Sequence, residues 1–152
     1  MFALKTNASG DLAGGPVVGP TRVVDPVELA KGWSLFDLGR SAEAVEVLEP
    51  LLLQVPKKRS RAWARIACRL ALSLASMREV DRSCALTVEI LTLAPVIRSA
   101  TIRSDLRQLS RMLTRWSFDP RVQDIMPRLS AALLPSAGHP SPLSFDGGEA
   151  GR

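Results

Sequence analysis

Apolar residues recur at helical spacing through most of this sequence. Six segments carry a one-sided apolar stripe when successive residues are placed about 100° apart. These segments are residues 26–38, 41–55, 60–77, 81–95, 99–116 and 120–134. Apolar and polar residues do not alternate over any stretch long enough to predict a strand. The pattern therefore predicts an all-α fold of about six helices, paired into antiparallel hairpins.

Two of these helices begin with the same local signal, an aspartate followed by a proline. Asp25 and Asp119 each offer a carboxylate that can accept hydrogen bonds from the free backbone N–H groups of a first helical turn. The next residues, Pro26 and Pro120, lack an N–H at a position where none is needed. Helices are therefore predicted to start at Pro26 and at Pro120.

Other boundaries are marked by glycine, serine and proline. Gly39 can adopt the left-handed conformation that ends a helix. Ser41 and Asp81 are expected to cap the helices that follow them. Pro50 and Pro127 lie inside predicted helices, where proline removes a backbone hydrogen bond. We therefore expect a kink near Pro50 and either a bend or a restart at Pro127.

The first predicted hairpin follows the spacing of a known helical repeat. Its marked positions are Gly32, Leu35, Gly39, Ala44, Leu48, Leu51 and Pro56. Residues 25–58 resemble one tetratricopeptide repeat, in which small residues let the paired helices approach closely. The resemblance implies tetratricopeptide-like hairpins stacked in a right-handed superhelix, with the shorter last helix as a cap.

A more specific resemblance rests on residues 78–86 and 93–103, together with the helix start at 25–29 and the turn at 38–44. These runs are similar to the carboxy-terminal tetratricopeptide region of actinobacterial helix-turn-helix transcriptional regulators. The resemblance covers residues 24–134 and implies a regulatory or sensing module. Such regulators carry an amino-terminal DNA-binding domain, whereas only a short leader precedes the repeats in this sequence. Direct binding to an operator is therefore not implied for this chain.

The two ends of the chain differ in composition from its centre. Residues 1–24 combine four glycines with two prolines, which predicts a flexible leader. Residues 25–134 form the predicted repeat domain. Residues 135–152 are again rich in glycine and proline and are predicted to be a disordered tail. Neither a signal peptide nor an apolar run of about 18 residues is evident, so we expect a cytoplasmic protein without membrane contact.

Charge is distributed unevenly along the chain. Residues 57–115 carry thirteen basic and four acidic residues, whereas residues 25–49 carry six acidic and two basic ones. Arginines recur at every fourth position on two predicted helices and form two ridges. The ridges are Arg61, Arg65 and Arg69, and Arg103, Arg107, Arg111 and Arg115. Both ridges lie opposite the apolar stripes at about 100° per residue, so both are expected to face water.

Two interpretations of the arginine ridges are open from the sequence. In the first, the ridges are a solvated face that pairs with Glu43, Glu46 and Glu49 of the first hairpin, at most about 1 kcal/mol per pair. In the second, both ridges line a concave groove and bind an acidic protein or peptide. Nucleic acid is the less favoured partner, because no aromatic residues interleave with the arginines. The sequence thus predicts a protein- or peptide-binding module, with a nucleic-acid-associated regulator as the alternative.

Residue types that carry catalysis are scarce. The single histidine, His139, lies in the predicted tail, which leaves no histidine for a triad or a metal site. Cys68 and Cys84 lie inside predicted helices without a histidine to activate them, and they are expected to be reduced, buried thiols. No glycine-rich phosphate-binding motif is present. We therefore expect neither enzymatic activity nor a cofactor.

The three tryptophans, Trp33, Trp63 and Trp116, belong to the apolar stripes. They could mark a ligand pocket, but large aromatic residues at helical spacing are typical of a core, so all three are expected to be buried. The indole N–H of each buried tryptophan then needs a hydrogen-bond acceptor.

Overall fold

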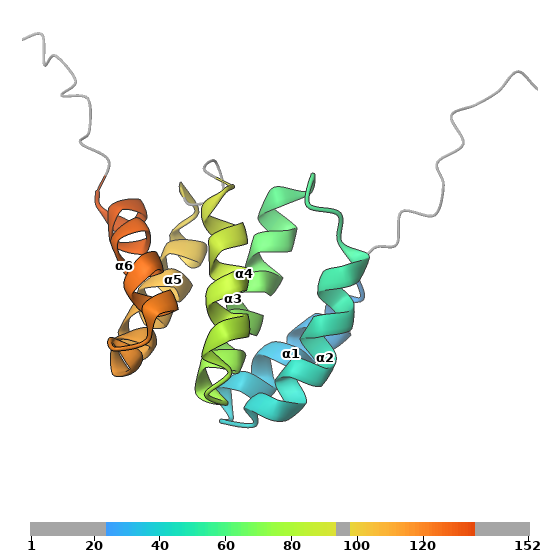
Figure 1. Cartoon of the computed structure of the whole chain (residues 1–152). Helices are drawn as coiled ribbons and strands as arrows, with labels where there is room; N and C mark the ends of the chain where they lie inside the picture. Colours follow the sequence, from blue (N-terminus) through green and yellow to red (C-terminus); the bar gives the residue numbers. More distant parts are fainter. Residues whose placement is uncertain (1–23, 94–97, 136–152) are drawn as a thin grey trace, which may run out of the picture.

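The computed structural model describes residues 24–93 and 98–135 (Figure 1). These residues form helices and short turns without a strand, so the predicted all-α class is confirmed. The elements are α1 (Pro26–Asp37), α2 (Ser41–Gln54), α3 (Ser60–Ser76), α4 (Val80–Leu91), α5 (Ala100–Leu113), the short 3-10 helix η2 (Thr114–Trp116) and α6 (Pro120–Leu133). The predicted flexible leader and disordered tail lie, except for Val24 and Pro135, outside the described residues.

Both aspartate–proline signals start helices as predicted. The Asp25 carboxylate accepts a hydrogen bond from the backbone N–H of Val27 at 2.9 Å. The Asp119 carboxylate accepts from the backbone N–H of Arg121 at 2.8 Å. In each case the side chain satisfies one of the donors that a first helical turn leaves free.

The predicted caps at Ser41 and Asp81 are wrong. Ser41 is the first residue of α2, and Asp81 is the second residue of α4, and neither helix has a side-chain cap. The turns before these helices are closed by the backbone instead. Gly39 and Arg78 adopt left-handed conformations, with φ of 76° and 64°. The following N–H groups donate back five residues, to the carbonyls of Leu35 and Leu74 at 2.8 and 2.9 Å.

These two turns show that the first and second hairpins repeat one geometry. Gly39 ends α1 in the same way that Arg78 ends α3. Glycine adopts this conformation at little cost, whereas arginine does so rarely. The sequence therefore indicates the left-handed residue at Gly39 but gives no sign of the one at Arg78.

Neither internal proline ends its helix. α2 continues through Pro50 and α6 continues through Pro127. The restart that the sequence allowed at Pro127 does not occur. Each proline lies on an exposed side of its helix, where water can reach the carbonyl that loses its hydrogen-bond donor.

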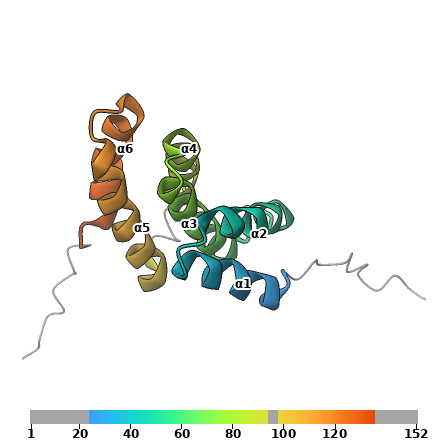
Figure 2. The ribbon, with the colours of Figure 1, turned by 90° about the horizontal axis from the view of Figure 1, so that it is seen from below.

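The three hairpins lie side by side, with α3 at the centre. Figure 2 shows the α1–α2 hairpin on one side of α3 and the α5–α6 hairpin on the other. α2 packs against α3 at the first junction. At the second junction, α5 packs against α3 and α6 packs against α4, while α4 and α5 are at most in marginal contact. The two junctions are therefore packed differently, whereas a regular superhelix would repeat the same packing at each junction.

The central position of α3 makes it the most buried of the described helices. Its buried residues include Trp63, Cys68 and Leu70, and they extend around most of the helix. Cys68 and Cys84 are both buried, with free thiols, as predicted. Trp33 and Trp116 are only partly buried, so the expectation of a buried tryptophan is fully met by Trp63 alone.

Gly32 lies where α1 closely approaches Leu48 of α2. A Cβ atom at this position would lie 2.6 Å from Cδ2 and 2.8 Å from Cγ of Leu48. Leu48 is fully buried, so its side chain can move away only by displacing its neighbours. The close approach agrees with the role that the repeat pattern gives to a small residue here.

Replacing Gly32 by alanine is expected to lower the free energy of unfolding by about 1–2 kcal/mol. Overpacking of a core costs about 1–3 kcal/mol, and the better helix propensity of alanine offsets up to about 1 kcal/mol of that. Urea denaturation measures the net change. Leu48→Ala removes the atoms that clash, so the costs of the two substitutions should be less than additive. Strict additivity would contradict the close approach.

Candidate functional site

The arginine ridge of α3 lies between neighbouring helices. Arg61 is exposed, whereas Arg65 is half-buried, with its guanidinium 4.5 Å from the centre of the Trp33 ring. Arg69 is also half-buried. The expectation that this ridge faces water is therefore wrong for Arg65 and Arg69. α1 and α5 flank this side of α3 and cover it.

Arg69 of α3 forms ion pairs with residues of α1 and α5. Its Nη1 lies 3.1 Å from an oxygen of Asp37 on α1, and its Nη2 lies 3.4 Å from an oxygen of Asp105 on α5. Its guanidinium also lies 5.7 Å from the centre of the Phe36 ring. Because the two carboxylates occupy both ends of its guanidinium group, Arg69 has a structural role.

Asp105 is an acid buried between α3 and α5, with 7% of its side chain exposed. Burial raises the pKa of this carboxyl above its ordinary value, and the charges of Arg69 and Arg65 oppose that rise. Burial, with a contribution from the charge of Asp105, also raises the pKa of the Cys68 thiol. The Cys68 thiol is therefore protonated at neutral pH and is not a nucleophile.

The arginine ridge of α5 is divided between a structural residue and exposed ones. Arg103 is half-buried, and its Nη2 donates to the carbonyl of Leu133 at 2.7 Å, at the end of α6. It therefore satisfies a helix C-terminus instead of facing water, contrary to the prediction. Arg107, Arg111 and Arg115 are exposed, and none of them forms an ion pair with a described residue.

The two ridges do not line one groove. Asp105 faces Arg69 on α3. Arg107 follows Asp105 by two residues, which places it roughly 160° away around α5. The exposed arginines of α5 therefore point away from α3.

The alternative interpretation of the ridges, as partners of the first hairpin's glutamates, is also wrong. Glu43 pairs with Arg40, and Glu49 pairs with Arg82. Glu46 forms no ion pair within the described part of the chain. The pairs that the ridge arginines do form involve Asp37 and Asp105 instead.

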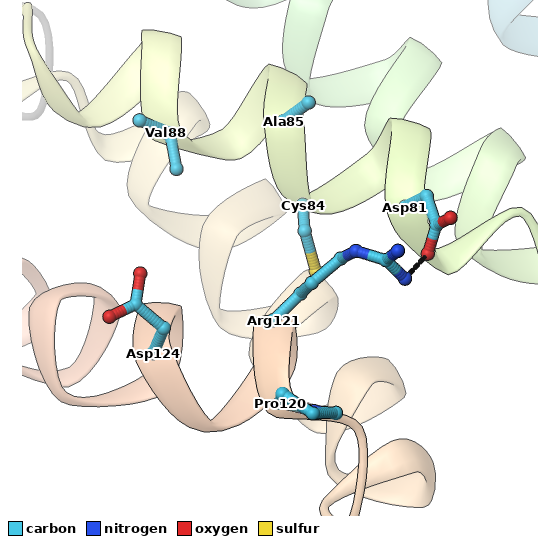
Figure 3. Close-up of a pocket in the computed structure, with 7 residues that line it drawn as sticks. All are labelled: Asp81, Cys84, Ala85, Val88, Pro120, Arg121 and Asp124. Carbon is cyan, nitrogen blue, oxygen red and sulfur yellow. Dashed lines mark hydrogen bonds and ion pairs between the residues drawn. The ribbon is translucent and has the colours of Figure 1, made fainter.

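A pocket that the sequence did not predict lies between α4 and α6 (Figure 3). Its volume is about 430 Å³, and its walls include Ala85 and Val88 of α4 and Asp124 of α6. An ion pair between Asp81 and Arg121 crosses from one helix to the other at one end of the pocket. These two residues are 40 positions apart in the sequence, so no local motif could reveal their pairing.

Cys84 lies on the α4 side of this pocket, with its sulfur directed toward α6 in Figure 3. Burial raises the pKa of the Cys84 thiol, and the negative charges of Asp119 and Asp81 add to the effect. The thiol is therefore protonated at neutral pH. The pocket offers charged walls and an apolar patch to a ligand, but no activated nucleophile.

The described residues contain no group of three metal-binding side chains that could hold a metal ion together. None of the described helices combines the length and the apolar character needed to span a bilayer. Comparison of the chain with protein-family models, with curated proteins and with solved structures finds no match. The resemblance to tetratricopeptide proteins therefore rests on the residues of the chain, and it stays a prediction.

Proposed function

We propose that this chain is a non-enzymatic helical repeat module that binds an acidic protein or peptide through the exposed arginines of α5 and η2. The observation that carries the proposal is that Arg107, Arg111 and Arg115 are exposed and lack an acidic partner among the described residues. Like charges one helical turn apart repel by roughly 0.2–0.5 kcal/mol per pair. A partner that supplies carboxylates would relieve this repulsion.

The spacing of these arginines indicates what kind of acidic partner fits. Residues four apart on a helix are separated by about 6 Å along its axis. Carboxylates one turn apart on a partner helix repeat at the same distance. Each guanidinium can bind a carboxylate through two parallel hydrogen bonds. An acidic helix is therefore the partner with the best geometric match.

The proposal includes the family and the role that the sequence suggested. We regard the chain as a regulatory module of the tetratricopeptide-like class that works in the cytoplasm. The repeated turn geometry at Gly39 and Arg78 and the close approach at Gly32 support the repeat class. The free thiols of Cys68 and Cys84 suit a reducing compartment.

The double variant Arg107→Glu/Arg111→Glu is expected to bind an acidic helical peptide at least about tenfold more weakly than the wild type. Both residues are exposed, so the fold should be retained. The dependence of binding on ionic strength should also become flatter, because fewer charges pair across the interface. Calorimetric titration with a synthetic peptide carrying glutamate at every fourth position, at two salt concentrations, measures both effects.

The matched control is Arg59→Glu/Arg128→Glu, which makes the same change in net charge at exposed positions outside the ridge. It should reduce affinity much less than the ridge variant. Equal losses in both variants would show that only net charge matters. Tighter binding of a single-stranded oligonucleotide than of the peptide, lost in the ridge variant, would favour the nucleic-acid alternative.

A further inference from the structure

A second surface, the α2–α4 groove, is formed by residues of three helices. The groove has a volume of about 260 Å³. Its base includes Leu70 and Leu74 of α3, which are buried, and its walls include Leu52, Leu53 and Leu86. Leu53 is 86% exposed although it belongs to this apolar surface. The groove can therefore take up an apolar side chain from outside the molecule.

Two ion pairs connect the helices that form the groove. Arg82 of α4 pairs with Glu49 of α2. Glu89 of α4 pairs with Lys57, which follows α2. Glu49, Arg82 and Glu89 also line the groove itself. Both carboxylates are thus already paired with cations of this chain, so the walls are close to neutral and the apolar base suits an apolar side chain.

This chain presents such a side chain on the turn between η2 and α6. Phe118 is 92% exposed. The turn is held by a hydrogen bond from the N–H of Asp119 to the carbonyl of Trp116 at 2.8 Å. The Gln123 side chain also donates to the carbonyl of Ser117 at 3.0 Å. Phe118 is therefore displayed on an ordered turn, so little conformational entropy is lost when it is buried.

We propose that Phe118 of one copy of this chain binds in the α2–α4 groove of a second copy. Figure 1 places the turn between α5 and α6 and the C-terminal end of α2 on opposite sides of the molecule, so Phe118 cannot fill the groove of its own chain. The contact buries an exposed phenylalanine against leucines. Different surfaces meet, so the assembly is head-to-tail and can extend beyond a dimer.

This self-association is independent of the proposed function, because it uses Phe118 and the α2–α4 groove, whereas the function rests on Arg107, Arg111 and Arg115. A contact centred on one side chain is small, and small interfaces are weak. The weight-average mass of the full chain should therefore rise with concentration between about 10 µM and about 1 mM. Sedimentation velocity measures this rise. A single-chain mass across the whole range would overturn the proposal.

Two single variants test the two surfaces separately. Phe118→Ala removes the inserted side chain, and Leu53→Lys places a charge in the apolar groove, where the phenylalanine ring would have to cover it. Each variant alone should stay monomeric over the concentration range. Leu38→Lys is the matched control, because Leu38 is also an exposed leucine at the end of a helix but lies outside the groove. It should associate like the wild type, and circular dichroism should show all three variants folded.

Mixing the two disabled variants distinguishes a head-to-tail contact from a symmetric one. Phe118→Ala keeps an intact groove, and Leu53→Lys keeps an intact Phe118. The mixture should therefore form one-to-one dimers that do not grow further. A mixture that stays monomeric, or wild-type-like association of either variant alone, would overturn the proposal. Loss of association in Leu38→Lys would do the same, since the contact would then not be specific to the groove.

Discussion

Replacing Leu109 by alanine is expected to lower the free energy of unfolding by about 2–5 kcal/mol. Leu109 is fully buried in the stripe of α5, the helix that packs against both α3 and α6. Deleting its side chain loses the transfer free energy of the removed atoms and leaves a cavity at the second junction. Leu70→Ala should cost a similar amount, because Leu70 is buried on α3. Chemical denaturation followed by circular dichroism measures both changes.

Gln108→Ala is the control for Leu109→Ala. Gln108 is exposed on the same helix, and its replacement by alanine should change stability by no more than about 0.5 kcal/mol. A near-neutral Leu109→Ala would show that α5 does not pack against α3 as the structure describes. Near-neutral results at Leu70 and Leu109 together would contradict the stacking of the hairpins altogether.

Several features that depend only on neighbouring residues could be predicted from the sequence, although the caps expected at Ser41 and Asp81 do not form. The caps at Asp25 and Asp119 are correct because a capping carboxylate bonds to the backbone only two residues away. The left-handed residue at Gly39 is correct for the same reason. The buried positions Leu70 and Leu109 follow from the helical period alone.

Features that depend on the arrangement of the helices could not be predicted in this way. The helical period places Arg65 and Arg69 opposite an apolar stripe, which predicts exposure only if a helix has a single buried side. α3 has neighbours on several sides, so these arginines are covered by α1 and α5. Trp116 leaves the stripe of α5 because the α-helix ends at Leu113 and continues as a 3-10 turn.

The candidate sites show the same limit. The exposed arginines Arg107 and Arg111 were identified from their spacing, because they lie on the outer side of a helix that has neighbours on the other sides. The α2–α4 groove and the pocket beside Cys84 were not identified, because each combines side chains from helices far apart in the sequence. The exposure of Phe118 could not be predicted either, since an isolated phenylalanine between helices is usually buried.

Replacing Arg69 by alanine is expected to lower the free energy of unfolding by about 2–4 kcal/mol near neutral pH. The substitution leaves the buried carboxylate of Asp105 without its closest cation and removes the contact with Phe36. It also breaks the ion pair with Asp37, although that carboxylate is largely exposed and contributes little. Most of the loss is therefore the cost of a buried charge without a partner.

The size of this loss should depend on pH. Burial raises the pKa of Asp105 in the folded protein, and Arg69 opposes that rise, so the pKa should rise further without Arg69. An acid with a raised pKa takes up its proton in the folded state at a higher pH than in the unfolded state. Protonation of this acid therefore stabilises the folded state at low pH. The stabilisation is lost as the pH rises through the folded-state pKa and returns as the pH falls. The cost of Arg69→Ala should therefore shrink between about pH 7 and about pH 4.

Asp105→Asn in the Arg69→Ala background isolates the charge of the carboxylate from the loss of packing. The neutral amide needs no cation, so the double variant should be more stable than Arg69→Ala near neutral pH. It should also lose the pH dependence, because the titrating group has been removed. Denaturation of the wild type, the two single variants Arg69→Ala and Asp105→Asn, and the double variant at several pH values gives the coupling between the two residues. A cost of Arg69→Ala that stays constant with pH, and that Asp105→Asn fails to reduce, would mean that Arg69 stabilises the junction of α1, α3 and α5 by packing alone.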